Sequence, residues 1–277
     1  MKKSKPVILG VSCLITGILF LGFALAENAQ TTNSPHFSAN EIMDKAFWAV
    51  RLDGVEMLST LTIYNAKGNE RVRKTAGVSK LYDGGQTEKR LVRFTAPADV
   101  KGTGLLTYDY EKKDDDIWFF LPALRKTRRI VASEKAKSFM GSEFTYADMT
   151  PPPVEEFNHR LLPKEVVQNV SCWVIESVPN NEKIAEENGF ARKISYVGKD
   201  DFIVRKAIYY DLDQELHKEL RVLDVQEIDT QKHRYRPMHL VMENKQNNRR
   251  SVLKIEKIQL RPDIPDEYFT TRYLERE

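Results

Sequence analysis

The chain has 277 residues, with 43 Lys and Arg against 40 Asp and Glu and only two cysteines. Three of the lysines and no acidic residue lie in the first 26 residues, so the rest of the chain carries equal numbers of basic and acidic side chains. This balance argues against a nucleic-acid partner recruited by overall charge, and any basic site must be local. Cys13 also lies in that first stretch, which leaves Cys172 alone and excludes an intrachain disulfide in the remainder.

The N-terminal residues 1–26 have the layout of a secretory signal peptide. Three lysines precede an apolar run over residues 7–25, and the small residues Ala24 and Ala26 suit a signal peptidase that rejects bulky side chains. We therefore expect cleavage after Ala26 and a single mature domain, 27–277, outside the cytoplasm. One alternative is an uncleaved anchor, because the run approaches the roughly 20 residues that span a bilayer. Lipid attachment at Cys13 is disfavoured because this cysteine lies inside the run.

A helix is the first element predicted after the leader. Ser38 to Glu41 has the pattern of a capping box, and apolar residues then recur at helical spacing from Ile42 to Val50. This gives one apolar stripe that must pack on something larger.

From Val55 onward the apolar period becomes two, which predicts antiparallel strands joined by short turns. Residues 194–199 are ambiguous between strand and short helix, and residues 265–269 resemble a helical turn with proline at its first position. We expect about ten or eleven strands in one domain, in a sheet that curls around its apolar face with the helix filling the concavity. The predicted strands are 55–64, a strand restarting at 71–73, 88–95, 104–110, 117–121, 125–131, 172–178, 202–210, 216–228, 237–243 and 251–260.

Catalytic and metal-binding constellations are missing from the sequence. The five histidines are scattered, and no nucleophile elbow, P-loop or dinucleotide fingerprint occurs. The acidic run Asp114–Asp116 lacks the spaced ligands of a calcium loop and is typical of a solvated hairpin turn. A hydrolase using Ser142 or Asp148 would need a base that the sequence does not place nearby. We therefore expect no enzyme, no metal and no cofactor.

The segment from Leu124 to Ile130, with Lys135 and Lys137, concentrates six cations within thirteen residues. Arginines at a cavity rim could hold a phosphate or carboxylate head group through paired hydrogen bonds. The alternative is a solvated edge strand, in which basic side chains prevent edge-to-edge pairing.

Several motifs resemble the LolA-like outer-membrane lipoprotein-sorting protein family. The first block is F-x-x-P-x-D-V-K-G-T over residues 94–103, followed by W-F-x-L-P-A-L-R-K-x-R-R-I over residues 118–130. The second block is S-F-M-G-S-E-F-T-Y-x-D over residues 138–148. Later landmarks at residues 210–211 and 264–269 are similar as well, so the resemblance spans most of the mature chain.

This resemblance implies a periplasmic protein of mainly β (α+β) class. The expected fold is a single, strongly curved antiparallel sheet that forms an incomplete β-barrel, with helices plugging the concave face, as in LolA and LolB. Its apolar interior would accept acyl chains. The longer branch of the family, which this chain resembles, often accompanies inner-membrane exporters of lipids or other hydrophobic molecules. No catalytic residues come with the resemblance.

Candidate cavity residues are large apolar side chains on the predicted strands and the central loop. Each buried methylene contributes about 0.8 kcal/mol, so one acyl chain in such a cavity can supply most of a useful affinity. Large apolar residues of any β protein also build ordinary core, and this alternative applies to each candidate. The candidates are Met57, Leu61, Ile63, Phe94, Leu106, Trp118, Phe120, Phe139, Met140 and Phe144.

The sequence therefore favours a non-enzymatic periplasmic carrier for a lipid or lipoprotein, active in outer-membrane lipoprotein sorting or lipid transport. Arg125, Arg128 and Arg129 are the candidates for contact with an anionic head group or a partner. The alternative is an accessory protein with a packed interior and no ligand of its own, whose basic strand docks on a membrane exporter.

Overall fold

The computed structural model describes residues 37–276, which lie in one compact unit. The predicted signal peptide, residues 1–26, falls outside the described residues. Within residues 37–276, no helix is both long enough and apolar enough to cross a membrane.

The backbone forms one antiparallel sheet of thirteen strands, in the order β6-β5-β4-β3-β2-β1-β13-β12-β11-β10-β9-β8-β7. The strands are β1 Gly54–Tyr64, β2 Glu70–Tyr82, β3 Thr87–Ala96, β4 Gly104–Tyr110, β5 Asp116–Leu121, β6 Lys126–Ile130, β7 Phe157–Val167, β8 Val170–Pro179, β9 Arg192–Gly198, β10 Val204–Tyr210, β11 Leu216–Asp229, β12 Arg234–Asn244 and β13 Arg250–Leu260. The helices are α1 Ala39–Ala49, α2 Glu182–Asn188 and α3 Thr271–Leu274.

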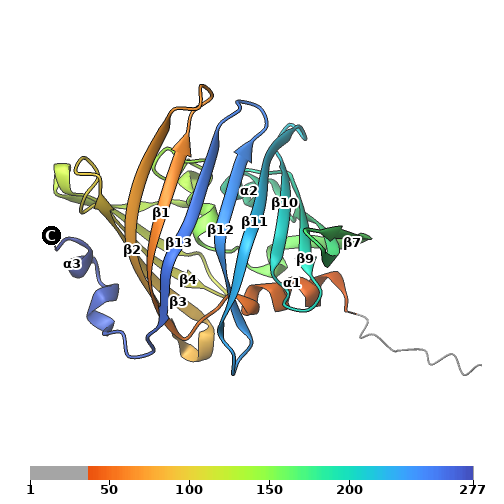
Figure 1. Ribbon diagram of the computed structural model, residues 1–277, viewed down its shortest axis with the longest axis horizontal. Helices are drawn as coiled ribbons and strands as arrows, with labels where there is room; N and C mark the ends of the chain where they lie inside the picture. Colours follow the sequence, from red (N-terminus) through yellow and green to blue (C-terminus); the bar gives the residue numbers. More distant parts are fainter. Residues whose placement is uncertain (1–36, 277) are drawn as a thin grey trace, which may run out of the picture. The chain divides into compact units, whose positions relative to one another are not determined.

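The sheet consists of two meanders that meet in its middle. Every neighbouring pair is also consecutive in sequence except β1 and β13, which pair from Val55 with Leu260 to Tyr64 with Arg250. The edges are therefore β6 and β7. Figure 1 shows the sheet curling so that β3 and β4 pass behind β2 and β13. The predicted fold class, a mainly β protein with an open, curved antiparallel sheet, is confirmed, and we call this sheet the half-barrel.

The strand count exceeds the predicted ten or eleven for local reasons. Strand β7 was not predicted because it is an edge strand whose side chains are mostly exposed on both faces, which removes the period-two signal. The ambiguous segment near residue 194 forms β9. Helix α2, which begins after the capping residue Asn181, was also missed because it is only seven residues long.

Helix α1 begins as predicted. The Glu41 amide donates to Ser38 Oγ at 3.3 Å and the Ser38 amide donates to Glu41 Oε2 at 2.7 Å, which completes the capping box. The buried stripe of α1, including Ile42, packs on Ile175 of β8 and Val197 of β9. The helix also contacts β7 and β12, and it leaves the rest of the concave face to another segment.

Apolar residues on the outer face of β3–β5 are covered by the C-terminal segment, residues 261–276. Leu106 and Phe120 pack there on Phe269 and Leu274, and all four side chains are at most 5% exposed. The predicted turn at residues 265–269 is present, with Pro265 just before its first residue. Strand β5 is therefore apolar on both faces because both faces are buried.

Replacing Phe269 with alanine should lower the free energy of unfolding by about 3–5 kcal/mol, because it removes a fully buried ring and leaves a cavity. Chemical denaturation of the purified domain measures this. Leu124→Ala, at a side chain that is 64% exposed, is the matched control and should change stability by less than about 0.5 kcal/mol. Equal effects of the two substitutions would show that the C-terminal segment does not pack on the sheet as described.

Candidate functional site

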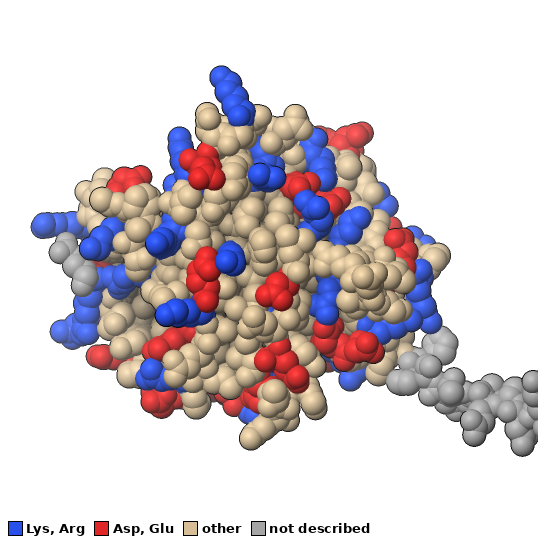
Figure 2. Space-filling model, viewed as in Figure 1, with Lys and Arg blue, Asp and Glu red and all other residues tan. Residues whose placement is uncertain are grey.

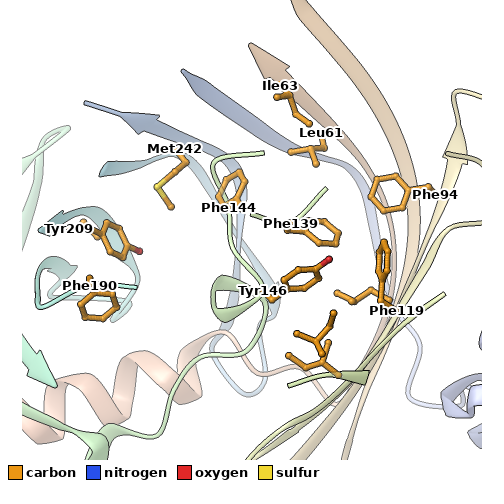
Figure 3. Packing of buried hydrophobic residues seen from close by; sticks show 14 of the residues in the cluster. Leu61, Ile63, Phe94, Phe119, Phe139, Phe144, Tyr146, Phe190, Tyr209 and Met242 are labelled. Atoms are coloured by element: carbon orange, nitrogen blue, oxygen red, sulfur yellow. The ribbon is translucent and has the colours of Figure 1, made fainter. Parts of the chain in front are cut away.

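The concave face of the half-barrel carries the largest apolar cluster, which we call the interior cluster (Figure 3). It combines side chains from both meanders with side chains from the connection between β6 and β7. Every member is at most 9% exposed. Its buried residues are Leu61, Ile63, Phe94, Val100, Leu105, Ile117, Phe119, Ile130, Phe139, Phe144, Tyr146, Phe157, Ile184, Phe190, Ala207, Tyr209 and Met242.

The centre of this space is filled by residues 138–150, which we call the inner segment. The Phe139 ring lies 5.9 Å from the Phe94 ring and 5.8 Å from the Tyr146 ring, between centroids, and Tyr146 in turn meets Phe119 edge to face at 6.2 Å. In Figure 3 these aromatic side chains point toward the strand residues around them. The concave face is therefore covered here by an irregular segment, and the interior is packed.

Local hydrogen bonds shape the inner segment. A single bridge pairs Ser138 with Thr145, and the turn between them has positive φ angles at Met140 and Gly141. Ser142 Oγ donates to the Phe139 carbonyl oxygen at 2.7 Å. The Asp148 carboxylate accepts from the amide of Thr145 at 2.7 Å and from its hydroxyl at 2.9 Å. Ser142 and Asp148, the candidates for a hydrolase, thus both make hydrogen bonds that hold this turn.

Basic side chains from the sheet bind carbonyl oxygens of the inner segment. Arg73 of β2 donates to the Met140 oxygen, and Arg90 of β3 donates to the Met149 oxygen. Lys218 of β11 donates to the Glu143 oxygen at 3.2 Å, and Arg249 donates to the Gly141 oxygen at 2.7 Å. The segment is therefore held to both meanders by charge-assisted hydrogen bonds, which are stronger than neutral ones.

Glu143 adds a second set of polar contacts. Its amide donates to Ser251 Oγ at 2.9 Å, and its carboxylate accepts from Asn244 Nδ2 at 2.8 Å. Arg249 Nε lies 3.0 Å from the same carboxylate. Glu143 is only 7% exposed, so these partners satisfy a charge that would otherwise be costly to bury.

The surroundings of these arginines shift their pKa values in opposite directions. Burial lowers the pKa of Arg73. Burial also acts to lower the pKa of Arg90, but the carboxylates of Glu88 and Asp109 outweigh it, and the pKa of Arg90 is raised. Both guanidinium groups are protonated at any physiological pH, so their hydrogen bonds to the inner segment persist.

The structure distributes the ten predicted cavity residues over two faces of the sheet. Six of them line or contact the interior cluster: Leu61, Ile63, Phe94, Phe139, Met140 and Phe144. Leu106, Trp118 and Phe120 belong to the cluster beneath the C-terminal segment, on the opposite face. Met57 is partly buried and lies among the residues of a groove described below.

The three predicted contact arginines lie at the β6 edge of the sheet. Arg125 precedes β6 in a left-handed conformation and is exposed. Arg128 donates to Glu134 at 2.9 Å, and Arg129 pairs with Asp116. Two of the three arginines therefore already have acidic partners within the chain.

A groove of about 1010 Å³ lies between the C-terminal segment and the outer face of β1, β2, β13 and β12. Tyr268 and Tyr273 border it on one side, and its floor includes Leu58 and Val78 together with charged side chains such as Lys254. Figure 2 shows this face of the molecule, where mostly uncharged atoms surround a few acidic and basic groups. Sequence reasoning did not foresee the groove because the C-terminal turn had no predicted partner.

Sequence reasoning also missed the residues that hold the inner segment, namely Arg73, Arg90, Lys218 and Arg249. Strand periodicity alone assigns Arg73 and Arg90 each to one face of its strand, but it does not show which face of the sheet is concave. Only the register of β2 with β1, in which Arg73 lies opposite Leu61, puts this arginine beside the interior cluster.

Comparisons with known proteins agree with this geometry. A family model described as "Uncharacterized protein" matches residues 86–276. The structure is similar to that of a protein domain assigned to outer-membrane lipoprotein sorting in Vibrio parahaemolyticus, with a TM-score of 0.78, 23% identity, and coverage of 86% of this chain and 98% of that one. A comparison with curated proteins finds no match.

Two further solved structures share the fold. A DUF1329 family protein from Desulfovibrio piger has a TM-score of 0.78 and 27% identity, and the match covers 85% of this chain and 97% of that one. A LolA superfamily protein from Nitrosomonas europaea has a TM-score of 0.65 and 21% identity, with coverage of 86% and 100%. The fold is thus that of the LolA-like class. The chain belongs to the family whose model matches residues 86–276, and the resemblance to LolA-like proteins that its motifs predicted is confirmed at the level of the fold.

Replacing Arg73 with methionine should loosen the inner segment, because it removes a charge-assisted hydrogen bond to the Met140 oxygen. Amide hydrogen exchange in residues 138–150 should become about tenfold faster, the change expected for a loss of roughly 1.4 kcal/mol. Arg71→Met, at an exposed arginine on the same strand, is the control. Unchanged exchange in Arg73→Met would mean that this contact does not restrain the segment.

Proposed function

We propose that this protein is a non-enzymatic periplasmic carrier that holds acyl chains of a lipid or lipoprotein inside the half-barrel, in outer-membrane lipoprotein sorting or lipid transport. Export through the N-terminal signal peptide belongs to the same proposal. The strongest support is the interior cluster, which is apolar and spans both meanders, yet is covered in its centre by the inner segment alone. The likeness of the fold to LolA-like structures supports the same function.

An acyl chain can replace the inner segment at a modest free-energy cost. Phe139, Phe144 and Tyr146 would leave an apolar space that the chain then fills, so the strand residues exchange one apolar contact for another. An acyl chain that buries eleven methylene groups gains about 9 kcal/mol of binding free energy, at ~0.8 kcal/mol for each group. The hydrogen bonds from the four basic side chains that hold the inner segment would be exchanged for bonds to water, which costs about 0.5–3 kcal/mol per bond.

A second candidate function is that of an accessory protein that docks on a membrane exporter and binds no ligand. The packed interior cluster is the observation that favours it, together with the groove beside Tyr268 and Tyr273. Arg125, Arg128 and Arg129 remain the proposed contacts with a head group or partner. An anionic group bound at Arg128 would compete with Glu134, and one bound at Arg129 would compete with Asp116.

Replacing Phe144 with alanine should raise the affinity for a single acyl chain. The space that the ring occupied is then free for the chain, so the inner segment does not have to move the ring out of it. Native mass spectrometry with 1-lauroyl-glycerol measures this, and we expect binding by the wild-type protein and about tenfold tighter binding by Phe144→Ala, which corresponds to roughly 1.4 kcal/mol.

Phe269→Ala is the matched control, because it removes an equally buried ring on the opposite face of the sheet. It should leave the affinity for 1-lauroyl-glycerol unchanged. Absence of lipid binding by wild-type protein and Phe144→Ala alike would contradict the carrier function and favour the docking protein.

A further inference from the structure

Charged side chains gather on the concave side of the sheet, near the end of α1. We call Arg51, Glu88, Arg90, Asp109 and Arg236 the interior charge cluster. Arg51 lies 3.1 Å from Asp109, and Arg90 lies 2.8 Å from Asp109 and 3.2 Å from Glu88. Arg51, Glu88 and Asp109 are each less than 5% exposed. Two guanidinium groups thus share two carboxylates, and these four residues are balanced.

Arg236 of β12 is the fifth member and has no acidic partner of its own. Its Nε and Nη2 atoms are buried and make no hydrogen bond within the described residues, and no ion pair forms there. Glu88 and Arg90 are its charged neighbours, and burial lowers the pKa of Arg236. Arg236 is partly buried, so two of its three guanidinium nitrogens are shielded from water without a hydrogen-bond partner, an arrangement that an anion would relieve.

A second polar group beside the cluster also lacks a partner. Ser79 of β2 lies directly opposite Arg90 of β3 and is fully buried, and its hydroxyl makes no hydrogen bond among the described residues. Arg90 also contacts the inner segment through the Met149 oxygen, so the charge cluster adjoins the space proposed for an acyl chain. Buried polar groups without partners are uncommon in folded proteins, and a bound polar ligand is one way to satisfy them.

We propose that Arg236 is the anchor of an anion subsite inside the half-barrel, which binds the phosphate group of the carried lipid. This inference rests on the proposed carrier function and names the chemistry of its ligand. The guanidinium fork of Arg236 matches a phosphate, which can accept two parallel hydrogen bonds from Nε and Nη2. The phosphate would neutralise the excess charge while the acyl chain lies against the interior cluster.

The test compares two lipids that differ only in the phosphate, 1-lauroyl-glycerol and 1-lauroyl-glycerol 3-phosphate, with inorganic phosphate as a third probe. Native mass spectrometry and thermal shift measure binding to the wild-type protein. We expect the phosphate lipid to bind about ten to a hundred times more tightly than the neutral lipid, the range for a hydrogen bond to a charged group.

In Arg236→Met, the two lipids should bind equally, at the affinity of the neutral lipid for the wild-type protein. The variant without ligand should be at least as stable as the wild type, because it removes a partly buried guanidinium group that has no ion-pair partner. Arg250→Met is the matched control, since Arg250 stacks on Tyr64 at 4.3 Å at an exposed position, and it should keep the preference for phosphate.

The outcomes separate the subsite from the carrier function. Equal binding of both lipids by the wild-type protein would overturn the subsite and leave the carrier function standing. Binding of inorganic phosphate alone, lost in Arg236→Met, would support a phosphate site but contradict lipid carriage. No binding of any probe would overturn both.

Discussion

The concave face of a thirteen-stranded sheet must be covered, and in this protein its centre is covered by hydrogen-bonded irregular backbone. The inner segment buries its aromatic side chains against the sheet, while basic side chains of the sheet bind its carbonyl oxygens. The apolar contacts resemble those that an acyl chain would make, and the polar contacts can be exchanged for water. The same arrangement therefore fits both a stable resting state and an interior that opens for a ligand.

The two faces of the half-barrel are buried by different means. The C-terminal segment covers the outer face of β3–β5 through Phe269 and Leu274, which are each at most 1% exposed. This segment directly follows β13 in sequence, so the pairing of β13 with β1 in the middle of the sheet positions the segment beside the outer face. On the concave side, by contrast, the cover comes from the connection between the two edge strands. The two covers thus contact different faces of the sheet and belong to different apolar clusters.

Much of the fold was predictable from the sequence, because period-two alternation and turn residues define most strands. Residues 104–110 form a strand with the bounds predicted, and the capping box at Ser38 is present. The site was less predictable. Leu106 and Phe120 have the apolar character expected of cavity residues but face outward, because a strand that is buried on both faces gives no sign of which face is concave. The sequence pattern does not distinguish Arg236 from any other strand arginine, and only the register of the sheet places it on the concave side.

The central claim is that an acyl chain occupies the space now filled by the inner segment. The most direct measurement is photocrosslinking with a lipid that carries a diazirine at the end of its acyl chain, followed by peptide mapping. We expect crosslinks to Leu61, Phe94 or Phe119, which surround the inner segment. Crosslinks confined to Tyr268 and Tyr273, in the groove on the outer face, would contradict the claim.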